Sequence, residues 1–141
     1  MKKFKLGKIQ KAWIANLRKH PERRRKRYLG KGNSRNYQAC CLGEALLTLC
    51  RINKKAFPFD SDTYLCDNTD SSILSYSYDK IGLYGKRGDI NIENVSPSRI
   101  TKEIRRLEGR SLASLNDNGY TWLQIADLLE KYPEAFFTES K

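Results

Sequence analysis

Four cysteines are the side chains of this sequence that could act as nucleophiles or metal ligands. Cys40, Cys41 and Cys50 fall within one apolar segment, and Cys66 follows further along. A cysteine near the positive, N-terminal end of a helix favours the thiolate, which is the nucleophile of cysteine enzymes. Such an enzyme also needs a base. The one histidine, His20, has no spacing that brings it near these thiols.

The spacing of the cysteines does not indicate a zinc site or a disulfide framework. Small zinc sites use paired spacings such as C-x-x-C or C-x-x-H, and neither occurs here. No apolar segment follows the basic N-terminus as in a secretory signal, so reduced thiols are expected. Free cysteines are often buried. We interpret them as buried structural thiols, expect no metal and no cofactor, and keep a cysteine-dependent enzyme as an alternative.

A run of five cations, Arg23 to Arg27, is the second chemical feature. Residues 1–36 contain fourteen Lys or Arg and one acid, a charge of +13, whereas residues 37–141 contain thirteen and fifteen, a charge of −2. Folding alone gives no evident reason to place five repelling cations together, whereas a polyanion neutralises them and releases counterions. The candidate nucleic-acid contacts are Arg23, Arg24, Arg25, Lys26, Arg27, Lys31 and Arg35.

Other uses of this region stay open. A solvated basic surface or a nuclear-targeting signal would have the same composition. The Gly30-x-Gly32 turn is either a plain loop or a place where backbone N–H groups approach a phosphate. Tyr28 either stacks on a base or anchors the loop.

The elements that position these residues form one domain of 141 residues. We expect a basic N-terminal helix and arm over residues 1–36 and a compact core over 37–141. Apolar residues at helical spacing predict a helix over 4–19, which Pro21 breaks. A second helix, buried and central, is predicted within 37–51 from the stripe Leu42, Ala45, Leu46 and Leu49.

Residues 53–98 are irregular, with short strands predicted at 63–66, 73–78 and 89–92. The acids in this region lack the spacing of a calcium loop. A helix is predicted to begin at Ser96 and Pro97, and Thr121 with Gln124 forms a capping box that starts the last helix. The predicted fold class is α+β, with three or four helices packed on a small antiparallel sheet.

The last helix is similar to the first helix of a helix-turn-helix. A recognition helix must follow the turn in that motif, and only twelve residues follow Leu129, Pro133 among them. The sequence therefore favours a packing helix here.

Several motifs together resemble a family of small, mostly uncharacterised bacteriophage and prophage proteins. They are Trp13 with Leu17-Arg18, the Gly30-x-Gly32 turn, Cys40-Cys41-Leu42-Gly43 with Leu49-Cys50, and Leu115 to Gly119 followed by a helix. Arg23 to Arg27 is not part of the family pattern. The resemblance implies phage origin and a helix hairpin at the C-terminus, and it implies no particular activity.

These observations favour a non-catalytic, phage-type accessory protein that binds nucleic acid or another phosphate-rich ligand through its basic arm. The alternative is a host-directed inhibitor, such as an anti-defence protein, that blocks an acidic host protein or sequesters a nucleotide signal. No apolar run reaches the ~18 residues that span a bilayer, so no membrane partner is expected. The expected location is the cytoplasm of the host cell.

Overall fold

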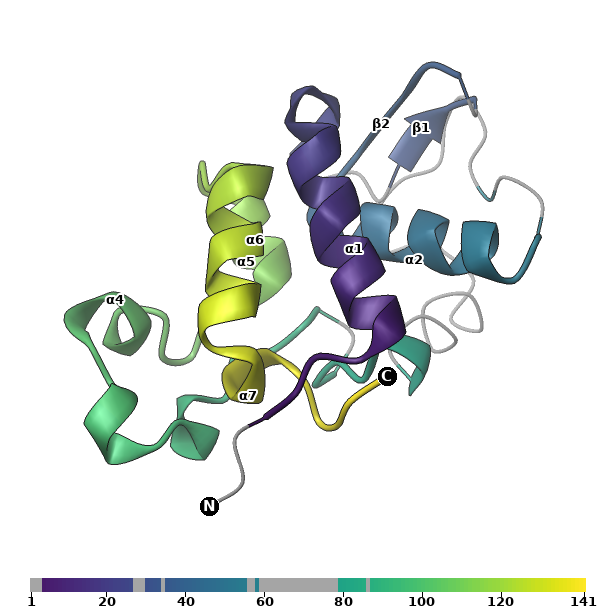
Figure 1. Ribbon diagram of the computed structural model, residues 1–141. Helices are drawn as coiled ribbons and strands as arrows, with labels where there is room; N and C mark the ends of the chain where they lie inside the picture. Colours follow the sequence, from purple (N-terminus) through teal and green to yellow (C-terminus); the bar gives the residue numbers. More distant parts are fainter. Residues whose placement is uncertain (1–3, 27–29, 34, 56–57, 59–78, 86) are drawn as a thin grey trace.

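The computed structural model describes residues 4–26, 30–33, 35–55, 58, 79–85 and 87–141. It confirms the α+β class, with helices and a two-stranded antiparallel sheet (Figure 1). The elements are α1 (Lys8–Lys19), β1 (Gly30–Gly32), β2 (Tyr37–Ala39), α2 (Cys41–Ile52), α4 (Lys102–Arg105), α5 (Leu112–Asp117), α6 (Trp122–Lys131) and α7 (Pro133–Phe136). Helix α1 begins at Lys8, four residues later than predicted. The helical segment predicted from Ser96 is divided into shorter pieces, and a separate short helix follows α6.

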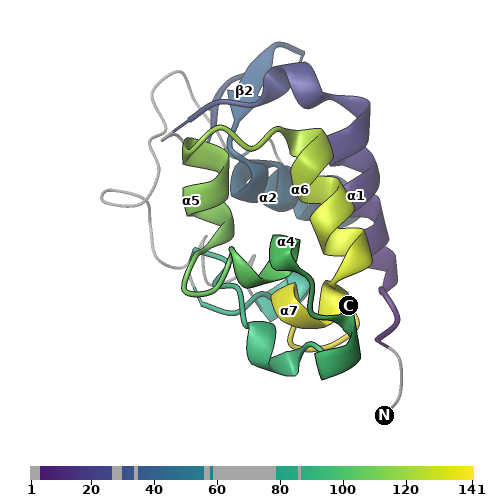
Figure 2. The same ribbon diagram turned by 90° about the vertical axis from the view of Figure 1, so that its left-hand side faces the viewer.

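Helix α2 lies at the centre of the fold, as predicted. Every residue from Cys41 to Cys50 is buried, so the helix is enclosed beyond its leucine stripe. Helices α1 and α5 both pack against it (Figures 1 and 2). The indole N–H of Trp13, which is fully buried, donates to the carbonyl of Cys41 at 3.0 Å. That bond satisfies the polar edge of a large buried side chain.

Helix α6 runs beside α1 on the outside of α2 (Figure 2). The predicted capping box is present, with the Thr121 hydroxyl accepting from the Gln124 N–H at 3.1 Å and the Gln124 side chain accepting from Thr121 N–H at 2.9 Å. The buried side of α6 includes Trp122, Ile125 and Leu129. None of the helices in the described ranges is long and apolar enough to span a membrane.

The sheet is a hairpin upstream of the place where the sequence predicts strands. Strand β1 pairs with β2 in the register Gly30 to Ala39, and the Asn33 side chain accepts from the N–H groups of Arg35 and Asn36 in the turn. Of the predicted strands, 63–66 and 73–78 lie outside the described residues. The prediction at 89–92 is wrong: Asp89 makes a single bridge to Ser111, and Ile92 begins a 3-10 helix.

The C-terminal half contains two interruptions. The helix predicted from Ser96 is a 3-10 helix, Pro97–Arg99, followed by an extended Ile100 and the single turn of α4. Pro133, expected only to end α6, also begins α7, whose Ala135 and Phe136 are buried. A recognition helix would have to follow α6. The helix that does follow it, α7, is packed into the core.

The two ends of the described chain meet at the start of α1. The backbone oxygen of Lys141 accepts from the N–H groups of Ile9 and Gln10, at 2.8 and 3.2 Å. The buried Gln10 side chain donates to the carbonyls of Ile81 and Glu139, at 2.8 and 2.7 Å. The Lys141 oxygen thus satisfies two N–H groups that the helix N-terminus leaves without intrahelical partners, and the Gln10 bonds satisfy its own buried amide.

Candidate phosphate-binding surface

The outer side of α1 carries a stripe of lysines. Lys8, Lys11 and Lys19 are exposed, as is Ala15 between them, while Trp13 and other apolar residues of α1 are buried on the opposite side. Positions 8, 11, 15 and 19 recur at the period of a helix and so share one face. The three lysine side chains make no hydrogen bond or ion pair with another described residue. We call them the α1 lysine stripe.

Arg18, next to Lys19 at the end of α1, is paired with acids of the neighbouring helix. Its guanidinium contacts Glu130 at 2.7 Å and Asp127 at 3.0 Å, both on α6. The hydrogen bond with Glu130, and then the one with Asp127, raises the pKa of Arg18. This arginine therefore joins α1 to α6 and is not an open anion contact.

The first arginines of the 23–27 run also have partners inside the molecule. The guanidinium carbon of Arg23 lies 4.1 Å from the centroid of the Tyr37 ring, a cation–π distance. Arg24 is half-buried, pairs with Ala39 through a parallel bridge, and donates to the backbone oxygen of Asn116 at 2.6 Å. Folding thus uses these cations, contrary to the expectation from charge repulsion alone.

Arg25 continues this docking. Its backbone N–H donates to the Ala39 carbonyl at 2.8 Å, and its side chain donates to Gln38 at 2.8 Å. Of the other sequence candidates, Lys26 and Arg35 are exposed and Lys31 is half-buried. Arg27 and Tyr28 lie outside the described residues. The structure therefore brings Arg23, Arg24 and Arg25 onto the core, and it leaves Lys26 and Arg35 at the surface near the hairpin.

The Tyr37 ring that Arg23 contacts belongs to a buried ionic cluster with Glu44 and Arg51. The Glu44 carboxylate, which is 0% exposed, accepts from the Tyr37 hydroxyl at 2.7 Å and from Arg51 at 2.9 Å. Arg51 also donates to the Tyr37 oxygen at 2.9 Å. Burial, followed by the hydrogen bond to Glu44, raises the pKa of Tyr37.

Sequence reasoning missed this cluster, although one signal was available. Glu44 is an acid inside an apolar segment that was predicted to be buried, and a buried carboxylate requires a partner. Arg51 follows it by seven residues, on the same side of α2. The cluster ties β2 to α2 and supports the ring on which Arg23 lies.

Cys40, Cys41 and Cys50 lie inside the core, as the sequence predicted. Cys40 is the N-cap of α2, and its sulfur accepts from the Gly43 N–H at 3.4 Å. Burial raises the pKa of Cys40 to about 12 and raises that of Cys41 well above its ordinary value. Burial therefore outweighs the positive helix end, and both thiols are protonated at neutral pH.

His20, the only histidine of the sequence, lies at the C-terminal end of α1, and its Nδ1 is 3.6 Å from the Glu22 carboxylate on the following 3-10 turn. Within the described ranges, no three His, Cys, Asp or Glu side chains are grouped so as to hold a metal ion. Cys66 lies outside the described residues. The exposed lysines, rather than the thiols, are the best-placed candidates for contact with a ligand.

Comparison with known proteins gives no relative: no family model, no curated protein and no solved structure matches this chain. The resemblance to phage proteins therefore stays a prediction.

Proposed function

We propose that this chain is a non-catalytic, phage-type accessory protein that binds nucleic acid or another phosphate-rich ligand through its basic N-terminal segment. The observation that supports this most directly is the α1 lysine stripe, whose three cations have no partner among the described residues. Lys26 and Arg35 are further exposed cations of the same basic segment, Arg35 within the hairpin turn. Arg23, Arg24 and Arg25 hold the segment in place.

The stripe has a geometry suited to a phosphate backbone. With a rise of 1.5 Å per residue, Lys8 and Lys11 are separated by about 4.5 Å along the axis, and Lys11 and Lys19 by about 12 Å. The opposite side of α1 is packed in the core, so binding needs no ordering of the helix backbone. Lysine acts as a point charge without a fixed hydrogen-bond geometry, which favours binding independent of base sequence.

The test is the salt dependence of binding to a fluorescently labelled oligonucleotide, followed by anisotropy. Replacing Lys8, Lys11 and Lys19 by Ser is expected to reduce the slope of log K against log salt by about 2 for a single strand, about 0.7 per lost contact. Absence of binding to the unmodified protein at about 50 mM salt would overturn the proposal.

A matched control removes the same number of charges elsewhere. Lys102, Arg105 and Arg106 are exposed residues of α4 and its end, with no side-chain partner among the described residues. Their replacement by Ser changes the net charge equally and is expected to leave the slope almost unchanged. An equal loss in both triple variants would mean that net charge alone, and not this surface, determines binding.

An acidic protein surface would suit the same lysines, so a host-directed inhibitor is the second proposal. Pull-down from host lysate with excess competing oligonucleotide separates the two. A host protein retained despite the competitor, and lost in the α1 triple variant, supports the inhibitor. Loss of every specific host protein on addition of the competitor supports nucleic-acid binding.

A further inference from the structure

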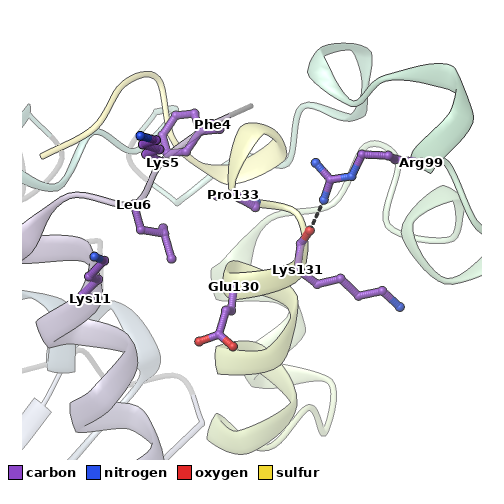
Figure 3. Close-up of a pocket in the computed structure, with 8 residues that line it drawn as sticks. All are labelled: Phe4, Lys5, Leu6, Lys11, Arg99, Glu130, Lys131 and Pro133. Atoms are coloured by element: carbon purple, nitrogen blue, oxygen red, sulfur yellow. Dashed lines mark hydrogen bonds between the residues drawn. The ribbon is translucent and has the colours of Figure 1, made fainter. Parts of the chain in front are cut away.

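A hollow of about 500 Å³ adjoins the α1 lysine stripe. Its walls come from the segment before α1, from α1 itself, from the end of α6 with the start of α7, and from the 3-10 helix Pro97–Arg99 (Figure 3). The volume lies within the range of about 300–1,000 Å³ that is usual for small-ligand pockets. The lining residues are Phe4, Lys5, Leu6, Lys11, Arg99, Glu130, Lys131 and Pro133.

The hollow, called the groove below, has paired charges on its α6 side and exposed lysines on its α1 side. On its α6 side, Arg99 is held by Glu134 and by the carbonyl of Lys131, and Figure 3 shows the latter bond. Lys131 pairs with Glu103 at 3.2 Å. On the α1 side, Lys5 and Lys11 are exposed and have no side-chain partner among the described residues.

The one acid of the groove is also compensated. Glu130 contacts Arg18 at 2.7 Å, so its charge is offset by an arginine of the neighbouring helix. The uncompensated charge of the groove is thus positive and lies on Lys5 and Lys11. An anionic ligand is therefore favoured, with its anionic part on that side.

The remaining lining is apolar and includes an aromatic ring. Phe4, Leu6 and Pro133 contribute to the walls. The Phe4 ring is partly buried and is stacked on Phe137, with centroids 6.3 Å apart and planes at 24°. This packing fixes Phe4 in the wall. A flat aromatic or apolar group of a ligand is the natural complement of such a wall, as in proteins that stack unpaired bases on aromatic side chains.

We propose that the groove takes one unpaired base of a single-stranded nucleic acid, whose flanking phosphates contact Lys5 and Lys11. This inference rests on the proposed function and specifies its ligand. Lys11 belongs both to the groove and to the α1 lysine stripe, so one strand could follow the stripe and insert a base beside it. A base within a duplex is stacked and paired, and exposing it costs a few kcal/mol, which favours a single strand.

The first test changes only the ligand. Binding of the full chain is compared for a single-stranded oligonucleotide and for an abasic strand of the same length, which has the same phosphates. The abasic strand is expected to bind about fivefold to a hundredfold more weakly, with an unchanged salt slope. Equal affinities would overturn the inference and leave the proposed function intact. If neither strand binds, both this inference and binding of single-stranded nucleic acid as the proposed function are overturned.

The second test changes the wall. Phe4→Leu keeps an apolar contact with Phe137 but removes the aromatic ring, and Tyr120→Leu removes a partly buried aromatic elsewhere. Phe4→Leu is expected to weaken the normal strand at least several-fold without affecting the abasic strand, and Tyr120→Leu to affect neither. Thermal unfolding checks that both variants fold. If Phe4→Leu weakens both strands equally, the base does not occupy this groove.

The third test locates the base directly. An oligonucleotide containing 5-iodouracil is photo-crosslinked to the unmodified protein, and the modified peptides are identified by mass spectrometry. Crosslinks to the peptide that contains Phe4 or to the one that contains Pro133 are expected. Crosslinks confined to other segments, such as the one that contains Tyr28, would overturn the assignment.

Discussion

The side-chain oxygen of Asn116 accepts a hydrogen bond from the backbone N–H of Cys41, over 3.1 Å. That N–H lies in the first turn of α2, where no intrahelical acceptor exists. The same oxygen accepts from the indole of Trp122 at 3.3 Å, and the Asn116 amide donates to the carbonyl of Arg25 at 2.7 Å. One fully buried amide thus connects α5 to α2, to α6 and to the basic segment.

Asn116→Ala is expected to lower the free energy of unfolding by about 2–4 kcal/mol, because it leaves several buried polar groups without partners. Urea denaturation followed by circular dichroism measures the change. Asn118→Ala, two residues on, removes a single exposed hydrogen bond to Ser114 and is expected to cost about 0.5 kcal/mol or less. Similar costs for the two variants would contradict the role assigned to Asn116.

The pair Glu44 and Arg51 gives a second prediction. Arg51→Ala leaves the buried Glu44 carboxylate with the Tyr37 hydroxyl as its remaining side-chain donor among the described residues, and we expect a loss of about 1–3 kcal/mol. The estimate is moderate because the Arg51 side chain is 46% exposed. Arg110→Ala, which removes an exposed arginine with no described side-chain partner, is the control.

A double variant tests whether the cost is that of an unpaired charge. Glu44→Leu with Arg51→Met replaces the ion pair by apolar side chains, and such replacements are often close to neutral in stability. The double variant is therefore expected to be more stable than Arg51→Ala alone. If it is less stable than Arg51→Ala, the attraction between Glu44 and Arg51 itself stabilises the fold.

Because its thiols are buried, the protein is expected to lose free energy of unfolding at alkaline pH. The folded pKa of Cys40, about 12, exceeds its ordinary value of 9.0. The folded protein therefore holds this proton to higher pH than the unfolded chain does. Its contribution is complete below pH 9 and declines as the pH rises from about 9 to about 12, by up to about 4 kcal/mol.

Urea unfolding at a series of pH values, in the presence of reductant, measures that decline. Cys40→Ser keeps an N-cap acceptor, with an oxygen in place of the sulfur, but removes the titrating thiol, so the stability of this variant should fall less steeply in this window. In a Cys66→Ser background, Cys40 and Cys41 should also resist a thiol reagent near neutral pH until the protein unfolds. Rapid labelling of either residue would contradict their burial.

Gly7 gives a steric prediction. A Cβ atom at this position would overlap the backbone carbon and oxygen of Lys141, and that oxygen caps the start of α1. Gly7→Ala is expected to lower stability by about 1–3 kcal/mol, the usual cost of overpacking. Deleting Lys141 removes the same contact, so the two changes together should cost less than their sum. Additive costs would show that Gly7 and Lys141 act independently.

Local rules predicted the parts of the fold that depend on neighbours three or four residues apart. The periodicity of Leu42, Ala45, Leu46 and Leu49 predicted α2, and the pair Thr121 and Gln124 predicted the start of α6. The hairpin at residues 30–39 was missed because each strand has three residues, too few for an alternating pattern, and β1 is Gly-Lys-Gly. Its position depends on contacts with Arg24 and Arg25.

Composition and periodicity alone establish that residues 1–36 carry a charge of +13 against −2 for the rest of the chain, and that Cys41 and Cys50 extend the apolar stripe of the central helix. Contacts between elements far apart in the sequence determine which of these cations remain available to a ligand. Arg18 meets Asp127 from 109 positions away, and Arg24 meets Asn116 from 92. These partners are brought together by packing between distant elements, so the local pattern of charges does not reveal them. The physical consequence is that arginines of the run secure the segment, while lysines on the outer side of α1 face solvent.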